Sequence, residues 1–402
     1  MSDWKTVTIG DIAKVYDGTH QTPNYVEDGV PFYSVEHVTS NNFADTKFVS
    51  QEVYEVESRR VFIEKGDILM TRIGDVGKAK YIDWDAEASF YVSLALIKCK
   101  PSVEPRYLTQ LINSSEGQRE IWGKTLHVAF PNKINLGDIS KCVIGVPDID
   151  EQKRIVAILE TWDEYLEKIN KKIERKKHVK KGLMQRLLTA EMRLPGFSGA
   201  WTHLPIGTIG KVVTGNTPPK DNSDNYVGDH YWATAEDFKS KFIHTTKVTL
   251  SLKGSRQSRI VPKGSILVTC IASIGKNAIA GTDLAMNQQI NAVIVDETYD
   301  NEFFYYQIGF SKNALLRIAG AGAMPMLNKQ DFSKIKMFAP KDKAEQTAIA
   351  NVLSVADKEL DELLKLKSTL TDQRKYLVNN LVSGKTRTPQ NLALADKETP
   401  YA

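Results

Sequence analysis

Two stretches of the chain place apolar residues at alternating steps of four and three, the heptad pattern of helices that pack along a seam. The first seam follows Pro147 and consists of Ile155, Leu159, Trp162, Leu166, Ile169, Ile173, Leu183 and Leu187. The second follows Pro340 and consists of Ile349, Leu353, Ala356, Leu360, Leu363, Leu370, Leu377 and Leu381. No other part of the chain sustains this pattern, so we expect one helical region over 149–190 and another over 342–388.

Polar residues interrupt both seams: Lys176 and Lys180 in the first, Lys367 and Arg374 in the second. Long lysine and arginine side chains can run along a seam and keep their charged ends in water. A polar seam position can instead fix the register of the two helices. The sequence leaves both interpretations open.

The remaining parts of the chain, 1–148 and 191–341, are divided by Gly and Pro and contain short β-type runs. Clear examples are the runs at 68–73, 91–97 and 266–271. We therefore predict an α+β protein in which two tandem mixed α/β domains, each with a twisted sheet, are joined by two long helices. A tail follows at 389–402.

The two domains and the two helices are copies of one another. KGDILMTRIGDVGK at 65–78 returns as KGSILVTCIASIGK at 263–276, an offset of 198. An offset of 197 relates Trp4, Ile9, Gly10, Ile12, Lys14, Val15 and Gly18 to Trp201, Ile206, Gly207, Ile209, Lys211, Val212 and Gly215. The helices repeat at 193 to 194, so one ancestral unit was copied once and a pseudo-twofold relation is expected.

Chain continuity predicts the direction of the helices. The first helix leaves the first domain and leads to the second, so the second helix must run back if the two seams are to meet. This arrangement is an antiparallel coiled coil, and residues 151–188 at 1.5 Å per residue would make it about 57 Å long. It would hold the two domains at a fixed separation.

Composition and charge exclude several classes of protein. The chain has 402 residues, is 42% hydrophobic and 25% charged, and has a net charge of +4, which fits folded domains and is too small by itself to indicate a polyanion ligand. The three cysteines, Cys99, Cys142 and Cys270, are too scattered for a disulfide framework or a zinc knuckle. Because no apolar run of 18 residues occurs, we expect a soluble, cytoplasmic chain.

Catalytic motifs are not evident. GQREIWGKT at 117–125 has one residue too many between its glycines for a phosphate-binding loop and has a helical pattern. Asp148, Glu151 and Lys153 imitate a nuclease signature, but they are too close in sequence to come from neighbouring strands, and Glu151 suits a first helical turn. The histidines show no metal-ligand spacing, and no methyltransferase loop is present. We expect a non-catalytic chain with no metal or cofactor of its own.

Several motifs together resemble the specificity (S) subunit of Type I restriction-modification enzymes. They are MRLPGFSGAWTHLPIGTIGKV at 192–212, Gly-Thr-His-x-Thr-Pro at 18–23, the repeated KGDILMTRxGxxGK segment, and Pro-x-x-x-Glu-Gln at the start of the first helix, which returns with one more residue before Glu-Gln at the start of the second. The resemblance extends from Trp4 to about Arg387. The first domain departs from it at 89–93, and the tail after Thr388 has no counterpart.

The resemblance implies two target recognition domains, each reading one half of a bipartite DNA sequence, with the helices setting the gap. It implies two modification subunits that hold S-adenosylmethionine and methylate adenine at N6, and restriction subunits that use ATP and Mg²⁺. The chain would bind double-stranded DNA and no membrane.

Side chains in the loops between short strands are the candidates for DNA contact, because Arg, Asn and Gln can pair with base edges and Lys suits phosphates. In the first domain these are His20, Gln21, Arg59, Arg60, Arg72, Lys78 and Lys133. In the second they are Asn216, Lys220, Arg256, Arg259, Lys276 and Lys329.

A basic cluster at 171–181 in the first helix has three interpretations. It holds seven Lys and Arg residues against the single Glu174, so it could face phosphates of the gap. A solvated helical face and a surface for an acidic partner protein remain open. Two other functions also remain: a coiled-coil scaffold that never touches DNA, and a nuclease built on Asp148, Glu151 and Lys153.

Overall fold

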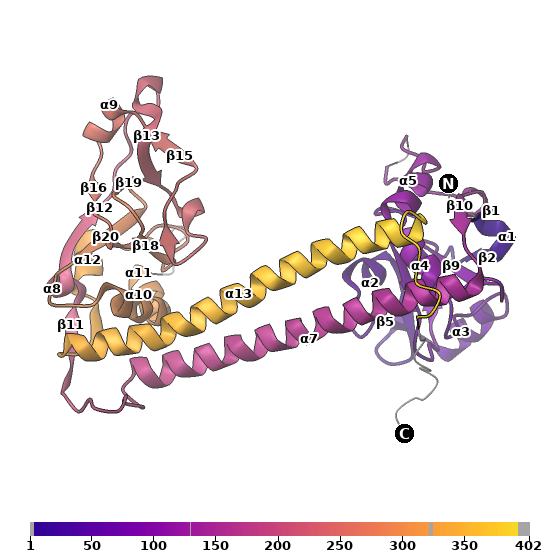
Figure 1. The fold of residues 1–402 in the computed structure, drawn as a ribbon, viewed down its shortest axis with the longest axis horizontal. Helices are drawn as coiled ribbons and strands as arrows, with labels where there is room; N and C mark the ends of the chain where they lie inside the picture. The colour runs from indigo at the N-terminus through magenta and orange to yellow at the C-terminus, as the bar shows by residue number, and fades with distance from the viewer. Residues whose placement is uncertain (1–3, 129, 321–324, 393–402) are drawn as a thin grey trace. The chain divides into compact units, whose positions relative to one another are not determined.

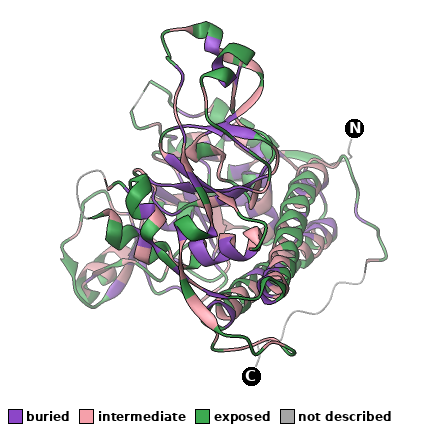
Figure 2. Ribbon diagram, turned by 90° about the vertical axis from the view of Figure 1, so that its left-hand side faces the viewer, coloured by how far each residue is buried: buried purple, intermediate pink, exposed green. Residues whose placement is uncertain are grey.

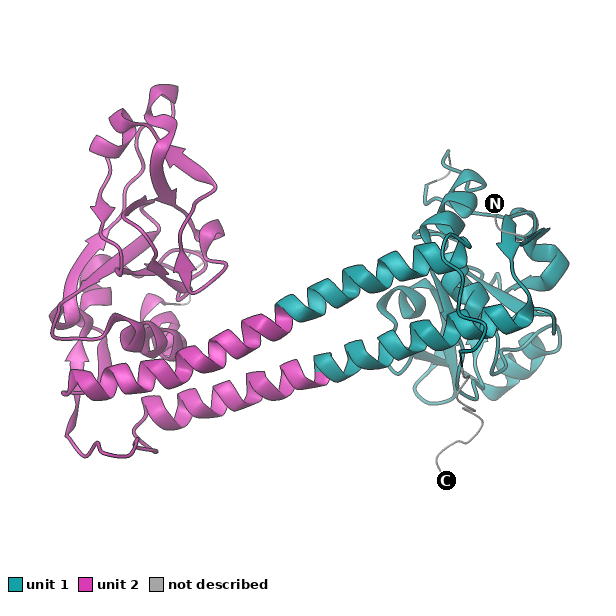
Figure 3. Ribbon diagram, in the orientation of Figure 1, with its two compact units in different colours: residues 1–170, 365–402 teal, residues 171–364 magenta. Residues whose placement is uncertain are grey.

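The computed structural model of the chain describes residues 4–128, 130–320 and 325–392. They form two compact units, one made of 1–170 and 365–402 and the other of 171–364 (Figure 3). Two helices of 40 residues, α7 (Ile149–Leu188) and α13 (Lys343–Val382), each contribute to both units. The unit boundary therefore crosses each predicted helical region.

The first domain contains three sheets, ordered β2-β9-β6-β7, β3-β5-β4-β8 and β1-β10. Its strands are β1 (Lys5–Thr8), β2 (Ala13–Asp17), β3 (Tyr25–Val26), β4 (Val30–Tyr33), β5 (Lys47–Val49), β6 (Ile68–Thr71), β7 (Ala79–Tyr81), β8 (Ser89–Phe90), β9 (Leu94–Cys99) and β10 (Val143–Val146). Its helices are α1 (Ile9–Ile12), α2 (Val35–Ser40), α3 (Gln51–Ser58), α4 (Pro105–Asn113), α5 (Ser115–Gly123) and α6 (Leu136–Ser140).

The second domain repeats this plan with the sheets β12-β20-β17-β18-β14, β15-β13-β19-β16 and β11-β21. Its strands are β11 (Trp201–Pro205), β12 (Gly210–Thr214), β13 (Tyr226–Ala233), β14 (Phe242–Ile243), β15 (Val248–Leu250), β16 (Ile260–Val261), β17 (Ile266–Thr269), β18 (Asn277–Ala280), β19 (Leu284–Met286), β20 (Ile290–Val295) and β21 (Lys336–Pro340). Its helices are α8 (Ile206–Ile209), α9 (Leu252–Arg256), α10 (Asn301–Phe310), α11 (Lys312–Ala319) and α12 (Lys329–Lys334), with 3-10 turns at Ser223–Asn225 and Ala235–Asp237.

The matching strand orders confirm the internal repeat. The antiparallel pair β2 and β9 corresponds to β12 and β20, and the parallel pair β4 and β8 corresponds to β13 and β19. In both copies a glycine with positive φ, Gly66 at 102° and Gly264 at 88°, forms the turn before the central buried strand. A side chain there would strain the backbone, which explains why both copies have glycine.

The predicted β-runs are present with shifted ends. The runs at 68–73 and 266–271 become β6 and β17, which end at Thr71 and Thr269 because a tight turn follows each of them. The run at 91–97 becomes β9, which begins at Leu94 after a turn in which Leu94 N–H donates to the Tyr91 carbonyl. Local periodicity therefore located these strands but not their boundaries.

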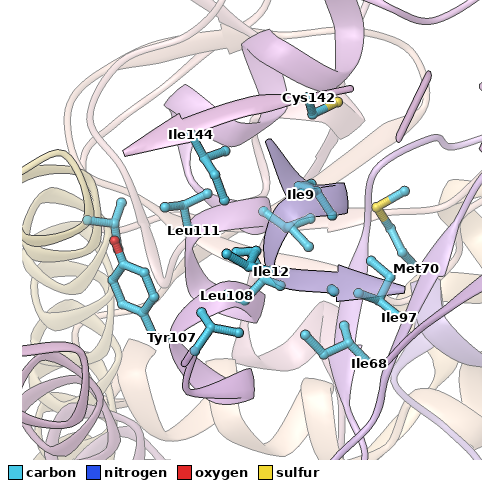
Figure 4. Close-up of a cluster of buried hydrophobic side chains, with 14 of the residues drawn as sticks. Ile9, Ile12, Ile68, Met70, Ile97, Tyr107, Leu108, Leu111, Cys142 and Ile144 are labelled. Carbon is cyan, nitrogen blue, oxygen red and sulfur yellow. The ribbon is translucent and has the colours of Figure 1, made fainter. Parts of the chain in front are cut away.

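Each domain has its own apolar core, and in both cores the long helices take part. In the first domain Ile9, Ile68, Ile97 and Leu108 pack together (Figure 4), and Ile155 of α7 belongs to the same cluster. The second core is built in the same way, with contributions from Leu187, Leu188, Ile349 and Leu353 of the helices. Buried residues concentrate on the strands, whereas the long helices carry exposed residues over much of their surface (Figure 2).

Every predicted seam residue is buried or half-buried. In each unit the segments of α7 and α13 lie side by side and run in opposite directions (Figure 1). The ion pairs demonstrate this antiparallel order: Lys176 pairs with Glu359, and Lys180, one turn later, pairs with Asp357, which comes earlier in α13.

The first helix begins at the predicted residue, Ile149, but both helices end earlier than predicted. The first was expected over 149–190 and ends at Leu188; Ala190 then adopts a positive φ of 60°. The second was expected to reach 388 but ends at Val382, because Gly384 turns the chain with a φ of 68°. The predicted tail at 389–402 falls largely outside the described residues, which end at 392.

Candidate nucleic-acid interface

Two of the predicted DNA-contacting arginines occupy equivalent places in the two domains. Arg60 donates from Nη1 to Asp17 Oδ1 at 2.7 Å, and its Nη2 donates to the Asp17 carbonyl. Arg259 donates from Nη1 to the carbonyl of Thr214 at 2.8 Å. Asp17 and Thr214 end the equivalent strands β2 and β12, so both arginines fasten a loop to the same point of the fold.

Asp17 is the centre of a charged cluster in the first domain. The residue is buried and is 2.7 Å from His20 Nε2 as well as from Arg60. Burial raises the pKa of this carboxyl, but hydrogen bonds from His20 and Arg60 outweigh it and hold the pKa below its usual value. The cluster borders a pocket of about 220 Å³ that Tyr54, Glu57 and Ser89 also line.

Arg72 lies on the inner side of this cluster. Its Nε donates to the Ile134 carbonyl at 3.2 Å, and its Nη1 lies 3.6 Å from Asp17 Oδ2. This buried Nη1 has no hydrogen-bond partner among the residues that the structure describes. Burial lowers the pKa of the guanidinium, and the Asp17 charge opposes this effect. As described, Arg72 is positioned to support the loop and not to reach a base.

Asn216 is likewise engaged within the second domain. Its Nδ2 donates to the Gln257 carbonyl at 2.6 Å, and its Oδ1 accepts from the backbone N–H of Arg259 at 2.8 Å. Both groups that would pair with adenine are therefore occupied by the chain's own backbone in this structure.

The other candidates for DNA contact have exposed side chains. These are His20, Gln21, Arg59, Lys78 and Lys133 in the first domain and Lys220, Arg256, Lys276 and Lys329 in the second. Lys78 and Lys276 are equivalent, because each follows a positive-φ glycine and its backbone N–H donates to a threonine hydroxyl, at 2.9 Å to Thr71 and 3.1 Å to Thr269. The two domains thus present a lysine from the same turn.

The basic cluster at 171–181 is partly neutralised by the chain itself. Lys176 and Lys180 pair with Glu359 and Asp357 of α13, and Lys177 pairs with Glu174 at 2.8 Å. Both seam lysines therefore form specific contacts with the opposite helix, which favours the interpretation that polar positions fix the register.

Sequence reasoning missed the contacts made by the first turn of each long helix. Glu151 is buried and accepts two hydrogen bonds from Arg387, whereas Glu345 accepts two from Arg193. The next residue in each helix, Gln152 or Gln346, accepts from a domain backbone N–H at 2.8 Å and donates to Pro147 or Pro340. The signal was the Glu-Gln pair that follows a proline by three or four residues at the start of each long helix. Glu151 lies in the first turn as expected, but an arginine satisfies its charge.

The described residues offer little for catalysis. Burial raises the pKa of Cys99 and Cys142 to about 12 and that of Cys270 to about 11, so all three remain protonated thiols near neutral pH. The 117–125 segment lies mostly in α5, as its pattern predicted. In the described part of the chain, no group of three or more His, Cys, Asp or Glu residues is placed to hold a metal ion. No described helix is long and apolar enough to cross a membrane.

Solved structures share the architecture of this chain. A chain from a study of complex assembly and conformational transition of the type I R-M system matches with a TM-score of 0.64 and 15% identity, covering 95% of this chain and 98% of that one. The S subunit of a Type I restriction-modification system from M. genitalium matches with a TM-score of 0.60 and 14% identity, covering 94% and 96%. These similarities show the fold.

Sequence relatives match over nearly the full length. The putative type I restriction enzyme MjaX specificity subunit of Methanocaldococcus jannaschii is 25% identical, covering 96% of this chain and 94% of its own. The type I restriction enzyme HindI specificity subunit of Haemophilus influenzae is 24% identical, covering 96% and 100%. The family model described as the Type I restriction modification DNA specificity domain matches twice, over residues 1–176 and 199–371. The repeat seen in the sequence is thus a pair of such domains, and the chain belongs to the type I restriction-modification DNA specificity family.

Proposed function

We propose that this chain recognises a bipartite DNA target, with one half-site read by each domain and the gap between them set by α7 and α13. The observation that carries the proposal is that equivalent contacts form at the start of both long helices. Each domain contacts its long helix through an equivalent glutamine, Gln152 or Gln346. The preceding glutamate, Glu151 or Glu345, pairs in both copies with an arginine of the segment that follows the other long helix. Two equivalent domains in one chain suit two half-sites on one duplex.

The exposed basic and amide side chains support contact with DNA. Lys78 and Lys276, presented from equivalent turns, suit phosphates, and Gln21, Arg59 and Arg256 can reach base edges. The internally bonded Arg60, Arg72, Asn216 and Arg259 would instead hold the loops that carry these side chains. A coiled-coil scaffold without DNA binding is not favoured, because the matched family model is a DNA specificity domain.

The chain is the recognition component, and the chemistry belongs to partner subunits. Two modification subunits would hold S-adenosylmethionine and methylate adenine at N6 where this chain directs them. Restriction subunits would use ATP and Mg²⁺ to cleave DNA that lacks the modification.

The test is co-expression with a cognate modification subunit in a host without DNA methylation, followed by single-molecule sequencing for N6-methyladenine. We expect a split motif of fixed bases, a gap and further fixed bases. An active complex that leaves no methylated motif would favour the scaffold. Expression of the modification subunit without this chain is the control and should give no methylated motif.

A further inference from the structure

Lys241, which directly precedes strand β14, joins the second domain to helix α13. Its Nζ lies 2.5 Å from Glu302 Oε2 and 3.0 Å from the hydroxyl of Tyr306, both on α10. The same Nζ lies 2.7 Å from Ser354 Oγ on α13. The Lys241 side chain is 14% exposed and the Glu302 side chain 35% exposed, so these contacts are partly shielded from water, which strengthens charged hydrogen bonds.

The network continues through α13 to α7. Tyr306 donates its hydroxyl hydrogen to Asp357 Oδ2 at 2.5 Å, and Asp357 also pairs with Lys180 of α7. Ser354 donates to Glu302 Oε2 at 2.8 Å. These contacts connect Lys241, α10 and both long helices in one polar network. The charges of its two lysines and two carboxylates balance.

The network adds a second directional contact between the second domain and α13, beside the hydrogen bond from Asp300 N–H to Gln346. Leu187, Ile349 and Leu353 of the helices pack on Phe303 and Phe304 of α10. Apolar packing is non-directional, so by itself it does not set the angle of the domain on the helices. Ser354 and Asp357 follow Leu353 within about one helical turn, and their hydrogen bonds give the domain a second, angle-dependent attachment.

The first domain has contacts at the equivalent positions, but with different chemistry. Arg374, equivalent to Lys180, pairs with Asp163 and donates to Gln110 Oε1 at 3.2 Å. Arg106 bridges Glu104 and Glu160, each at 2.9 Å. The attachment site is thus shared by the two copies, whereas the residues that form it differ.

We propose that Lys241 and Tyr306 are positioning residues that fix the angle of the second recognition domain on the helices and so determine which gap length is accepted. This inference rests on the proposed bipartite recognition. Neither residue needs to touch DNA for the effect, since one base pair more or less moves the second half-site by about 3.4 Å and turns it by about 35°.

The experiment compares wild type, Lys241→Met and Tyr306→Phe in complex with modification subunits. Each complex methylates duplexes whose gap is native, one base pair longer or one shorter. We expect wild type to prefer the native gap and both variants to lose about tenfold of that preference, equivalent to about 1.4 kcal/mol. Preference for the bases of each half-site should stay unchanged. Lys239→Met is the control and should behave as wild type. Lys239 lines a cleft that Lys241, Glu302 and Ser354 also line, but it belongs to no contact described above.

A purely structural role would give a lower melting temperature with unchanged gap preference, and that result would overturn the proposal. Should Lys241→Met fail to fold, Tyr306→Phe decides alone, because it keeps the ring and removes only the hydroxyl. Absence of any split motif with the wild-type complex would defeat the proposed function and this inference together. If wild type and both variants prefer the native gap length equally strongly, only this inference is contradicted and the proposed function stands.

Discussion

Arg387 and Glu151, 236 residues apart in sequence, form a two-pronged ion pair: Nε donates to Oε1 at 2.7 Å and Nη2 to Oε2 at 2.6 Å. Arg193 and Glu345 form the same pair in the other unit, at 2.7 and 2.9 Å. In both cases the arginine follows the end of one long helix and the glutamate begins the other. The segment after each long helix therefore forms an ion pair with the first turn of the other, antiparallel helix.

Removing Arg387 should destabilise the first unit. Arg387→Ala leaves the buried Glu151 charge without its main partner. We expect a loss of about 3 kcal/mol, the lower end for breaking a buried pair, because the Arg387 side chain is 49% exposed. Urea unfolding measures the change, and Lys385→Ala, a neighbouring exposed substitution, is the control. The double variant Arg387→Ala, Glu151→Gln should recover part of the loss; no recovery would mean that the pair is not the cause.

The chain alone should neither cleave nor methylate DNA in the presence of Mg²⁺, ATP and S-adenosylmethionine. Glu151, the central residue of the nuclease-like segment, is buried against Arg387 and is not available to a metal ion. The measurement is nicking and methyl transfer by highly purified protein. Activity that survives purification and disappears in Glu151→Gln would contradict this prediction.

Recognition should be modular. Replacing 1–148 by the matching domain of a relative should change one half of the methylated motif and leave the other, because each domain has its own core and its own helix contacts. Sequencing of N6-methyladenine in the co-expression host reads out both halves at once. A change in both halves would show that the domains do not act separately.

Acid should weaken the attachment of the second domain. Burial raises the pKa of Glu302, but hydrogen bonds from Lys241 and Ser354, together with the Lys358 charge, outweigh it and lower the pKa below the usual 4.5. A lowered folded pKa contributes stability above the unfolded value, and this contribution disappears as the pH falls through the folded value. The difference in unfolding free energy between wild type and Glu302→Gln should therefore shrink from about pH 7 to about pH 3. A constant difference would argue against the ionised carboxylate as the source.

Lengthening both helices should lengthen the gap. Seven residues inserted after Ile169 alone mismatch the seams and should impair folding or assembly, whereas a second insertion after Leu363 restores the heptad pairing. The two insertions together lengthen the helix pair by about 10 Å at 1.5 Å per residue. This length corresponds to roughly three base pairs of gap at 3.4 Å each. Three base pairs also rotate the groove by about 100°, so affinity should fall unless DNA twist or the partner subunits absorb the rotation. A folded, active double-insertion complex with an unchanged gap would show that the helices do not set it.

The sequence by itself determined the duplication, the class of fold and the two seams. Helical periodicity and β-type runs are local signals, and burial of Ile155, Leu159, Ile349 and Leu353 follows directly from their spacing. Repetition of 65–78 at 263–276 made the second domain predictable from the first, and β6 and β17 are accordingly equivalent strands.

Only the tertiary structure decided how the polar side chains are used. Arg60, Asn216 and Arg259 have the chemistry of base contacts, yet the fold brings a backbone group within hydrogen-bonding distance of each. The partners of Glu151 and Lys241 lie more than 60 residues away in sequence, at Arg387 and Glu302. Hydrogen bonds and ion pairs require donor–acceptor distances between such segments to be correct within a few tenths of an ångström, and periodicity along the chain contains no information about these distances.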